Sequence, residues 1–191
     1  MTATMESRPG VTLPEPVTVT AAQYEAIPPN PRVELVDGVV QVMTPATRLH
    51  RIVVQKVRLA LEALCPEEWH IVWEQEIKFN ELHRRNPDVM AIRAEADDLK
   101  KYGFLPEDVL LAIEVVSPGT QTADRLHKPS EYAEHGIEHY WRVETSPRLT
   151  VHTYRLSGAG RYVETGVFLQ GESVAAPGLA WAALKVDEIA P

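Results

Sequence analysis

The residue most out of place in this chain is a glutamate within an apolar run. Glu114 lies in the stretch 109–117, whose other eight residues are apolar or small, and the turn-forming sequence Ser117-Pro118-Gly119 ends the run. Such a pattern is typical of a strand covered on both faces. A carboxylate buried there without a partner would cost a large desolvation free energy, so a cation must lie beside it. The candidates are a metal ion and Lys128.

A second acid, Asp88, stands near the start of a short apolar run at 87–92, which we expect to form another strand. Two carboxylates on neighbouring strands offer oxygen ligands, which suit a hard ion such as Mg²⁺. Such an ion would stabilise charge developing on a phosphate and lower the pKa of an attacking water, and a nearby lysine would add positive charge. Asp88, Glu114 and Lys128 supply that set. The alternative is a purely structural ion pair between Glu114 and an arginine.

The remaining patterns predict the elements that position these residues. Thr20 and Gln23 have the spacing of a capping box for a short helix at 21–26, and Asp37-Gly38 predicts a hairpin. Residues 1–17 are expected to form a loose arm and 18–191 a single α/β domain. Periodicity and turn residues predict a helix at 47–64, one strand at 71–79, a turn at 82–86, a helical segment at 122–136, and strands at 137–143, 148–156 and 162–169.

The composition limits the classes of partner. The chain has 191 residues and a formal net charge of -8, which argues against a general basic coat for nucleic acid but leaves room for a local patch. The single cysteine, Cys65, excludes an internal disulfide. No apolar run is long enough to cross a bilayer, and the first twenty residues lack the order of a signal peptide. We therefore expect a soluble cytoplasmic protein with no membrane partner.

Pro87-Asp88, followed by Glu114 26 residues later, resembles the Pro-Asp…(Asp/Glu)-x-Lys signature of the restriction-endonuclease-like nuclease superfamily. A longer combination of residues is similar to the Uma-type family of restriction endonucleases, a bacterial domain of unknown function. This likeness covers residues 20–185. It is carried by Ile113-Glu-Val-Val-Ser-Pro118, Asp124, Lys128, Tyr132-Ala133, Gly136-Ile137, Glu138 and Tyr140-Trp141, together with Val33-Glu-Leu-Val-Asp-Gly38 and His50.

The resemblance implies a restriction-endonuclease-like α/β fold, with a mixed central sheet flanked by helices and extra strands at both ends. It also implies hydrolysis of phosphodiester bonds in DNA with Mg²⁺ or Mn²⁺, held by Asp88, Glu114 and the carbonyl of Val115. Val116 stands where the superfamily has its lysine, and the family places that lysine on the following helix, which assigns its role to Lys128. Glu34 matches an acid of the first hairpin that would hold or orient a metal-bound water. The alternative for Glu34 is an exposed strand position.

Residues expected to contact nucleic acid are His50, at the start of the long helix, and Arg84 and Arg85, in a basic cluster that flanks Asp88. The alternatives are a surface or capping histidine and a solvated face. A homodimer is expected because cutting a duplex requires one site per strand. Two other functions stay open: a non-catalytic member of the fold that binds nucleic acid or protein, and a nuclease acting on RNA or small nucleotides.

Overall fold

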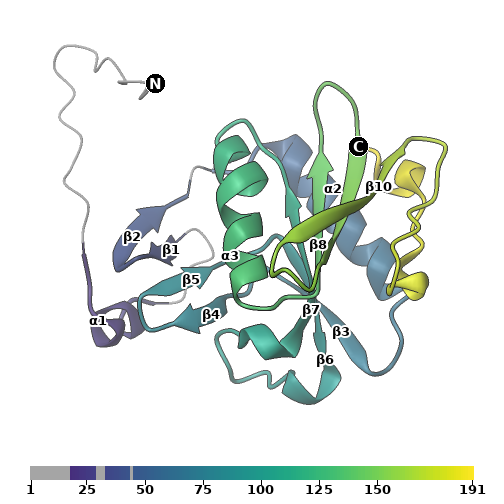
Figure 1. The fold of residues 1–191 in the computed structure, drawn as a ribbon. Coiled ribbons are helices and arrows are strands. Elements are labelled where there is room, and N and C mark those ends of the chain that lie inside the picture. Colours follow the sequence, from purple (N-terminus) through teal and green to yellow (C-terminus); the bar gives the residue numbers. More distant parts are fainter. Residues whose placement is uncertain (1–17, 29–32, 44) are drawn as a thin grey trace, which may run out of the picture.

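A computed structural model describes residues 18–28, 33–43 and 45–191 of the chain. The predicted N-terminal arm at 1–17 lies outside the described residues. Figure 1 shows two β-sheets side by side, the smaller built from the N-terminal half of the chain. The four strands of this sheet are, in spatial order, β2 (Val39–Val42), β1 (Val33–Val36), β5 (His83–Arg85) and β4 (Ile77–Asn80). A short helix, α1 (Ala21–Glu25), lies beside it.

The larger sheet has six strands and forms the centre of the fold. β7 and β8 run parallel, and the other neighbouring pairs are antiparallel, so the sheet is mixed, as expected. In spatial order the strands are β10 (Tyr162–Leu169), β9 (Thr150–Leu156), β8 (His139–Glu144), β7 (Val109–Val115), β6 (Val89–Arg93) and β3 (Trp69–Trp73).

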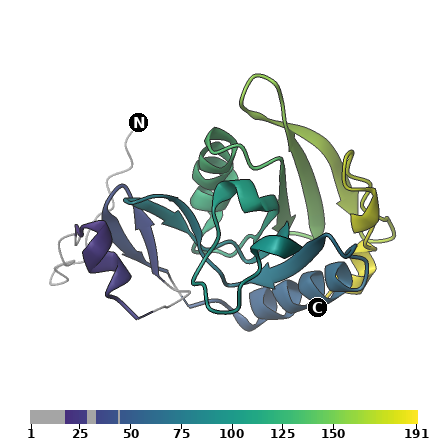
Figure 2. The ribbon, with the colours of Figure 1, turned by 90° about the horizontal axis from the view of Figure 1, so that it is seen from below.

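The two faces of this sheet are covered by different helices. α2 (Arg48–Glu62) and the C-terminal segment pack on one face, and α3 (Lys128–Glu134) packs on the other. Figure 2 shows α2 beside the C-terminal segment and away from α3. Successive side chains of a strand alternate between faces, and Ile113 and Val115 of β7 belong to the core on the α2 side. Glu114 therefore points towards α3.

Several predicted elements are confirmed. The capping box of Thr20 and Gln23 is formed, the hairpin turns at Asp37 and Gly38, and the long amphipathic helix is α2. The predicted strand at 162–169 coincides with β10. Among the residues that the structure describes, no helix combines the length and apolar character needed to span a membrane.

The predicted single strand at 71–79 is wrong, because the chain changes sheet within it. β3 ends at Trp73, Glu74 adopts a positive φ of 51°, and β4 begins at Ile77 in the smaller sheet. A non-glycine residue rarely adopts such a φ. Apolar and polar residues alternate in the sequence on both sides of the break, so the sequence pattern does not reveal it. The predicted turn at 82–86 instead contains β5, which pairs with both β1 and β4.

The predicted helical segment at 122–136 forms in two parts. A wide π-helical turn, Ala123–His127, precedes α3, and the Lys128 N–H donates to the Ala123 carbonyl. Pro129 has no N–H to give to the preceding turn, which explains why a regular α-helix does not run through this point. Gly136, with φ of 79°, follows the end of α3. This two-part helix sets the position of Lys128.

Candidate active site

The two acids predicted to bind metal lie next to each other at the end of a strand ladder. Val89 of β6 pairs with Ile113 of β7 in the antiparallel register, so the preceding Asp88 comes opposite Glu114. The Val115 N–H donates a hydrogen bond of 2.7 Å to Asp88 Oδ2. This bond holds the Asp88 side chain against β7, although Asp88 itself lies just before β6.

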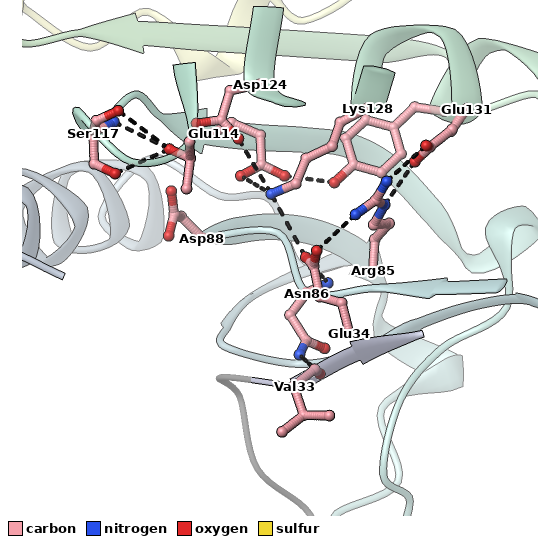
Figure 3. Close-up of polar contacts among 12 residues, drawn as sticks. Val33, Glu34, Arg85, Asn86, Asp88, Glu114, Ser117, Asp124, Lys128 and Glu131 are labelled. Carbon is pink, nitrogen blue, oxygen red and sulfur yellow. Dashed lines mark hydrogen bonds and ion pairs between the residues drawn. The ribbon is translucent and has the colours of Figure 1, made fainter. Parts of the chain in front are cut away.

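Lys128, the first residue of α3, extends into a group of carboxylates (Figure 3). Its Nζ donates to Glu114 Oε2 at 2.9 Å. The same nitrogen lies 3.3 Å from Asp124 Oδ1 and 3.6 Å from Glu34 Oε1. The side chains of Lys128 and Glu114 are each only 2% exposed. The Glu114 partner that the sequence left open is therefore Lys128, with Tyr132 donating to the other carboxylate oxygen at 2.5 Å.

The charges of this group are not balanced by one ammonium. Burial raises the pKa of Glu114 well above its usual value; Lys128 lowers it, and Asp124 raises it further. Burial also raises the pKa of Asp124. For Lys128, burial disfavours the charged form, but the negative charges of Glu114 and Glu34 outweigh burial and raise its pKa. Lys128 thus stays charged, whereas burial favours the neutral forms of Glu114 and Asp124.

Glu34 connects this group to a second buried cation. Its Oε2 accepts a hydrogen bond of 2.8 Å from Arg85, and its Oε1 accepts one of 3.1 Å from the Asn86 N–H. Arg85 also donates two bonds of 2.7 Å to Glu131 on α3 (Figure 3). Glu34 is 1% exposed, so the alternative of an exposed strand residue is excluded. It lies between Lys128 and Arg85.

Asp88, Glu114, Asp124 and Lys128 line a cavity of about 590 Å³, whereas Glu34 lies behind Lys128 and is not part of its lining. His50 borders it from α2, with Nε2 3.2 Å from Asp88 Oδ2. Burial lowers the pKa of His50, but the hydrogen bond and charge of Asp88 outweigh burial and raise it. His50 therefore faces the acids. Its main-chain N–H, which donates to the Thr47 side chain, takes part in the helix cap.

Arg84 and Arg85 do not line this cavity and are both buried. Arg84 forms ion pairs with Glu25 and Glu76, beside a separate, smaller cavity of about 260 Å³. Arg85 is paired with Glu34 and Glu131. The structure thus places both guanidinium groups against carboxylates, where a phosphate would have to displace an existing ion pair. Both arginines are buried because they belong to strand β5, which pairs with β1 and β4. In the turn expected at 82–86, both side chains would have been exposed.

The sequence matches the model of the Uma2 family, described as "Putative restriction endonuclease", over residues 21–187. The chain belongs to this family. No match was found among curated proteins.

A solved structure similar to this Uma2 protein is described as "a putative nuclease belonging to DUF820" from Anabaena variabilis ATCC 29413. The TM-score is 0.69 with 16% sequence identity, and the likeness covers 90% of this chain and 97% of the other. At this identity the likeness shows the fold alone. The restriction-endonuclease-like fold expected from the sequence is confirmed.

The donor atoms of the Uma2 site suit a hard divalent cation. They are carboxylate oxygens, and the buried Asp124 Oδ1 has no hydrogen bond of normal geometry within the described part of the chain, although Lys128 Nζ lies near it. Within 18–28, 33–43 and 45–191, no three His, Cys, Asp or Glu side chains form a ready-made metal cluster. Mg²⁺ keeps several waters and commonly binds through one or two carboxylates, so Asp88 and Glu114 fit it. Val115 donates its N–H to Asp88. Its carbonyl, which the family resemblance implies as a further metal ligand, directly follows that of Glu114 along the main chain.

Two residues of the site were given no role by the sequence. Asp124 precedes Lys128 by four residues, a spacing that brings their side chains together on a helix and could have signalled the contact. Tyr132 follows Lys128 by the same interval and reaches Glu114. Both appear in the residues of the family resemblance, but only the packing of α3 on β7 shows what they contact.

Proposed function

We propose that the protein is a metal-dependent endonuclease that hydrolyses phosphodiester bonds in DNA. Membership of the Uma2 family supports a nuclease. The observation that carries the proposal is a buried ammonium in contact with Glu114 and Asp124, with Asp88 opposite Glu114, at the wall of a cavity. A divalent cation would stabilise the ionised forms of these buried carboxyl groups, and the cavity gives a substrate access to it.

In this proposal each side chain has a separate task. Asp88 and Glu114 hold Mg²⁺ or Mn²⁺, with the Val115 carbonyl as a further ligand. When bound, the metal supplies charge stabilisation at the phosphate and a more acidic water. Lys128 stabilises negative charge on the phosphate, and its Nζ, which bonds to Glu114 Oε2, favours the ionised form of that carboxyl against the effect of burial. Glu34, 3.6 Å from the same nitrogen, orients Lys128 and a water next to it.

His50 is proposed to contact the substrate phosphate or to exchange a proton near it, because its ring faces Asp88 across the cavity edge. A raised pKa makes the ring a cation over a wider pH range, which favours a phosphate contact. Arg84 and Arg85 have less support as phosphate ligands, since both are buried in ion pairs.

The decisive experiment measures nicking of supercoiled plasmid at low salt, with Mg²⁺, Mn²⁺ or a chelator. Wild-type protein should nick only with metal, and Glu114→Gln and Asp88→Asn should each lower the rate at least about 100-fold. Glu164→Gln is the matched control, because Glu164 is an exposed residue of β10 outside the cavity. Calorimetric titration with Mn²⁺ should show binding to wild type that weakens in both site variants.

Nicking that persists with chelator, or in Glu114→Gln, would contradict the proposal. A folded protein that binds Mn²⁺ but cuts no DNA would instead support cleavage of RNA or small nucleotides, which the same assay can test with those substrates. Nucleic-acid binding without metal binding or turnover would favour the non-catalytic alternative.

A homodimer is part of the proposal, because a cut through both strands of a duplex requires one site for each. Light scattering at the concentration used for cleavage should give a mass near twice that of the 21.4 kDa chain. A strict monomer that still linearises plasmid in a single binding event would contradict this part.

A further inference from the structure

The cavity beside the acids continues well beyond them. Its volume of about 590 Å³ lies in the range of pockets that enclose whole small molecules, roughly 300–1,000 Å³. One phosphodiester group at Asp88 and Glu114 would leave much of this space unfilled. A second wall, formed by α2 and the end of β3, includes Arg51, Arg58 and Trp73. The character of this wall indicates what else the cavity holds.

The α2 part of the wall is one stripe of the helix. Arg51, Val54, Gln55 and Arg58 are spaced by three and four residues, so they share a face, and all four line the cavity. This stripe lies beside the apolar one that packs on the sheet. It supplies two guanidinium groups to a protein with a net charge of -8. This wall of the cavity thus carries positive charge, although the molecule as a whole is acidic.

Trp73, the last residue of β3, extends this wall. Its side chain is 43% exposed, and the Arg58 guanidinium carbon lies 3.8 Å from its ring centroid. Arg58 Nε has Glu62 Oε1 at 3.5 Å but no hydrogen bond of normal geometry within the described residues. Trp73 pairs with Val89, the residue after Asp88. The tryptophan therefore lies on the neighbouring strand, one position along from Asp88. An exposed indole and a flat guanidinium here form a platform for a planar ligand.

We propose that this wall binds an unpaired nucleotide of the DNA strand. The base stacks against the Trp73–Arg58 pair, and Arg51 contacts a phosphate of the same strand, while a neighbouring phosphodiester group lies at the acids. Bases within a duplex are covered by their neighbours and cannot stack on a protein side chain without leaving the helix. The preferred substrate is therefore single-stranded or locally unpaired DNA. The inference that the bound strand is also the one that is cut rests on the proposed nuclease function. The binding of the unpaired nucleotide does not rest on it.

The chain contains a matched control on the same strand. Trp69, at the other end of β3, also has an arginine over its ring, with the Arg93 guanidinium carbon 5.3 Å from the centroid. Neither Trp69 nor Arg93 lines the cavity. A general effect of losing a tryptophan–arginine pair from β3 should appear at both ends, whereas nucleotide stacking should appear only at Trp73.

The test is fluorescence anisotropy of a labelled 12-nucleotide single-stranded DNA, in chelator and at low salt, with the complementary duplex for comparison. Trp73→Ala should weaken single-strand binding about 5- to 100-fold, the range of base–aromatic stacking, and Trp73→Phe should keep most of it. Trp69→Ala should bind as wild type does. Arg58→Ala should weaken binding in the same direction as Trp73→Ala.

Trp73→Phe also gives a second readout that does not depend on the stability of Trp73→Ala. Adding the oligonucleotide should quench tryptophan fluorescence of the wild type and of Trp69→Phe, and the quenching should be lost in Trp73→Phe. Quenching that persists in Trp73→Phe, equal weakening by Trp69→Ala, or duplex binding at least as tight as single-strand binding would overturn the proposal. Because the assay uses chelator, a failure of cleavage would leave its result intact, and so the two proposals can fail separately.

Discussion

Lys128 and Arg85 are two buried cations that contact the same glutamate, Glu34, yet their surroundings differ. Arg85 donates two hydrogen bonds of 2.7 Å to Glu131 and one to Glu34, and it faces no part of the large cavity. Lys128 is a compact charge shared by several carboxylates, and it lines the cavity. Arginine suits a fixed bidentate pair and lysine a point charge, so each residue type matches its setting.

This difference separates a structural ion pair from a site prepared for chemistry. Around Arg85 the charges are matched, and the pKa of Glu131 is held at about 2, because its contacts with His83 and Arg85 outweigh the effect of burial. Around Lys128 the pKa of Glu114 is raised, chiefly by burial. A carboxyl group whose pKa stays raised beside a charged lysine would be stabilised in its ionised form by a further cation. Burial alone would not have distinguished the two regions, since both are nearly inaccessible to water.

The largest effect should come from removing the lysine. Lys128→Met leaves Glu114 and Asp124 buried without a cation, which should lower the free energy of unfolding by about 3–5 kcal/mol. The nicking rate should also fall about 100- to 1,000-fold. Denaturant unfolding and the plasmid assay measure these changes. If Lys128→Arg restores stability but not nicking, the position and size of the ammonium are what cleavage requires; full activity in Lys128→Met would remove Lys128 from the mechanism.

A smaller effect should follow from neutralising the acid that the sequence left without a role. Asp124→Asn removes one carboxylate from the unbalanced group, so the affinity for Mn²⁺ should fall about 10- to 100-fold. Stability should stay the same or rise, because a like charge beside Glu114 is lost. Calorimetry and denaturant unfolding give the two readouts. Unchanged metal affinity together with a large loss of stability would make Asp124 a structural partner of Lys128 only.

The smallest effect on cleavage should come from the Arg85 region. Glu131→Gln should lower the free energy of unfolding by about 1–3 kcal/mol at neutral pH and leave nicking close to wild type. Because the folded-state pKa of Glu131 is about 2, below its usual value of 4.5, its contribution is present above pH 4.5 and is lost as pH falls towards 2. The difference between wild type and variant, measured by denaturant unfolding at several pH values, should shrink over that window. A constant difference, or a cleavage loss as large as that of Lys128→Met, would end the distinction between the two regions.

Local patterns were enough to predict much of this molecule. Glu114 stood out because a charge within a buried strand needs a partner, and Lys128 was one of the two candidates. Regular periodicity predicted α2 and β10, and Asp37-Gly38 predicted the hairpin that carries Glu34. The short apolar run at 87–92 added Asp88, and the family resemblance added Glu34 and the restriction-endonuclease-like fold. The roles of these residues in catalysis stay predictions, although the structure brings all four side chains together.

The change of sheet after Trp73 could not be predicted from the sequence, because apolar and polar residues alternate in the same way on either side of Glu74. β5 was taken for a turn because its three residues are polar, and its arginines were therefore expected at the surface. Which sheet a strand joins depends on contacts with distant strands, and these leave no local period.

The sequence by itself determined which residues carry unusual chemistry, since a buried carboxylate, a turn or an amphipathic helix each follows from neighbours in the chain. The tertiary structure alone decided which charges meet. The packing of α3 on β7 gives Lys128 to Glu114 and Asp124, and pairing of β5 with β1 gives Arg85 to Glu34. It also placed Trp73 and Arg58 in the lining of the same cavity as the acids. Electrostatic and stacking energies depend on distances through space, and separation along the chain does not fix those distances.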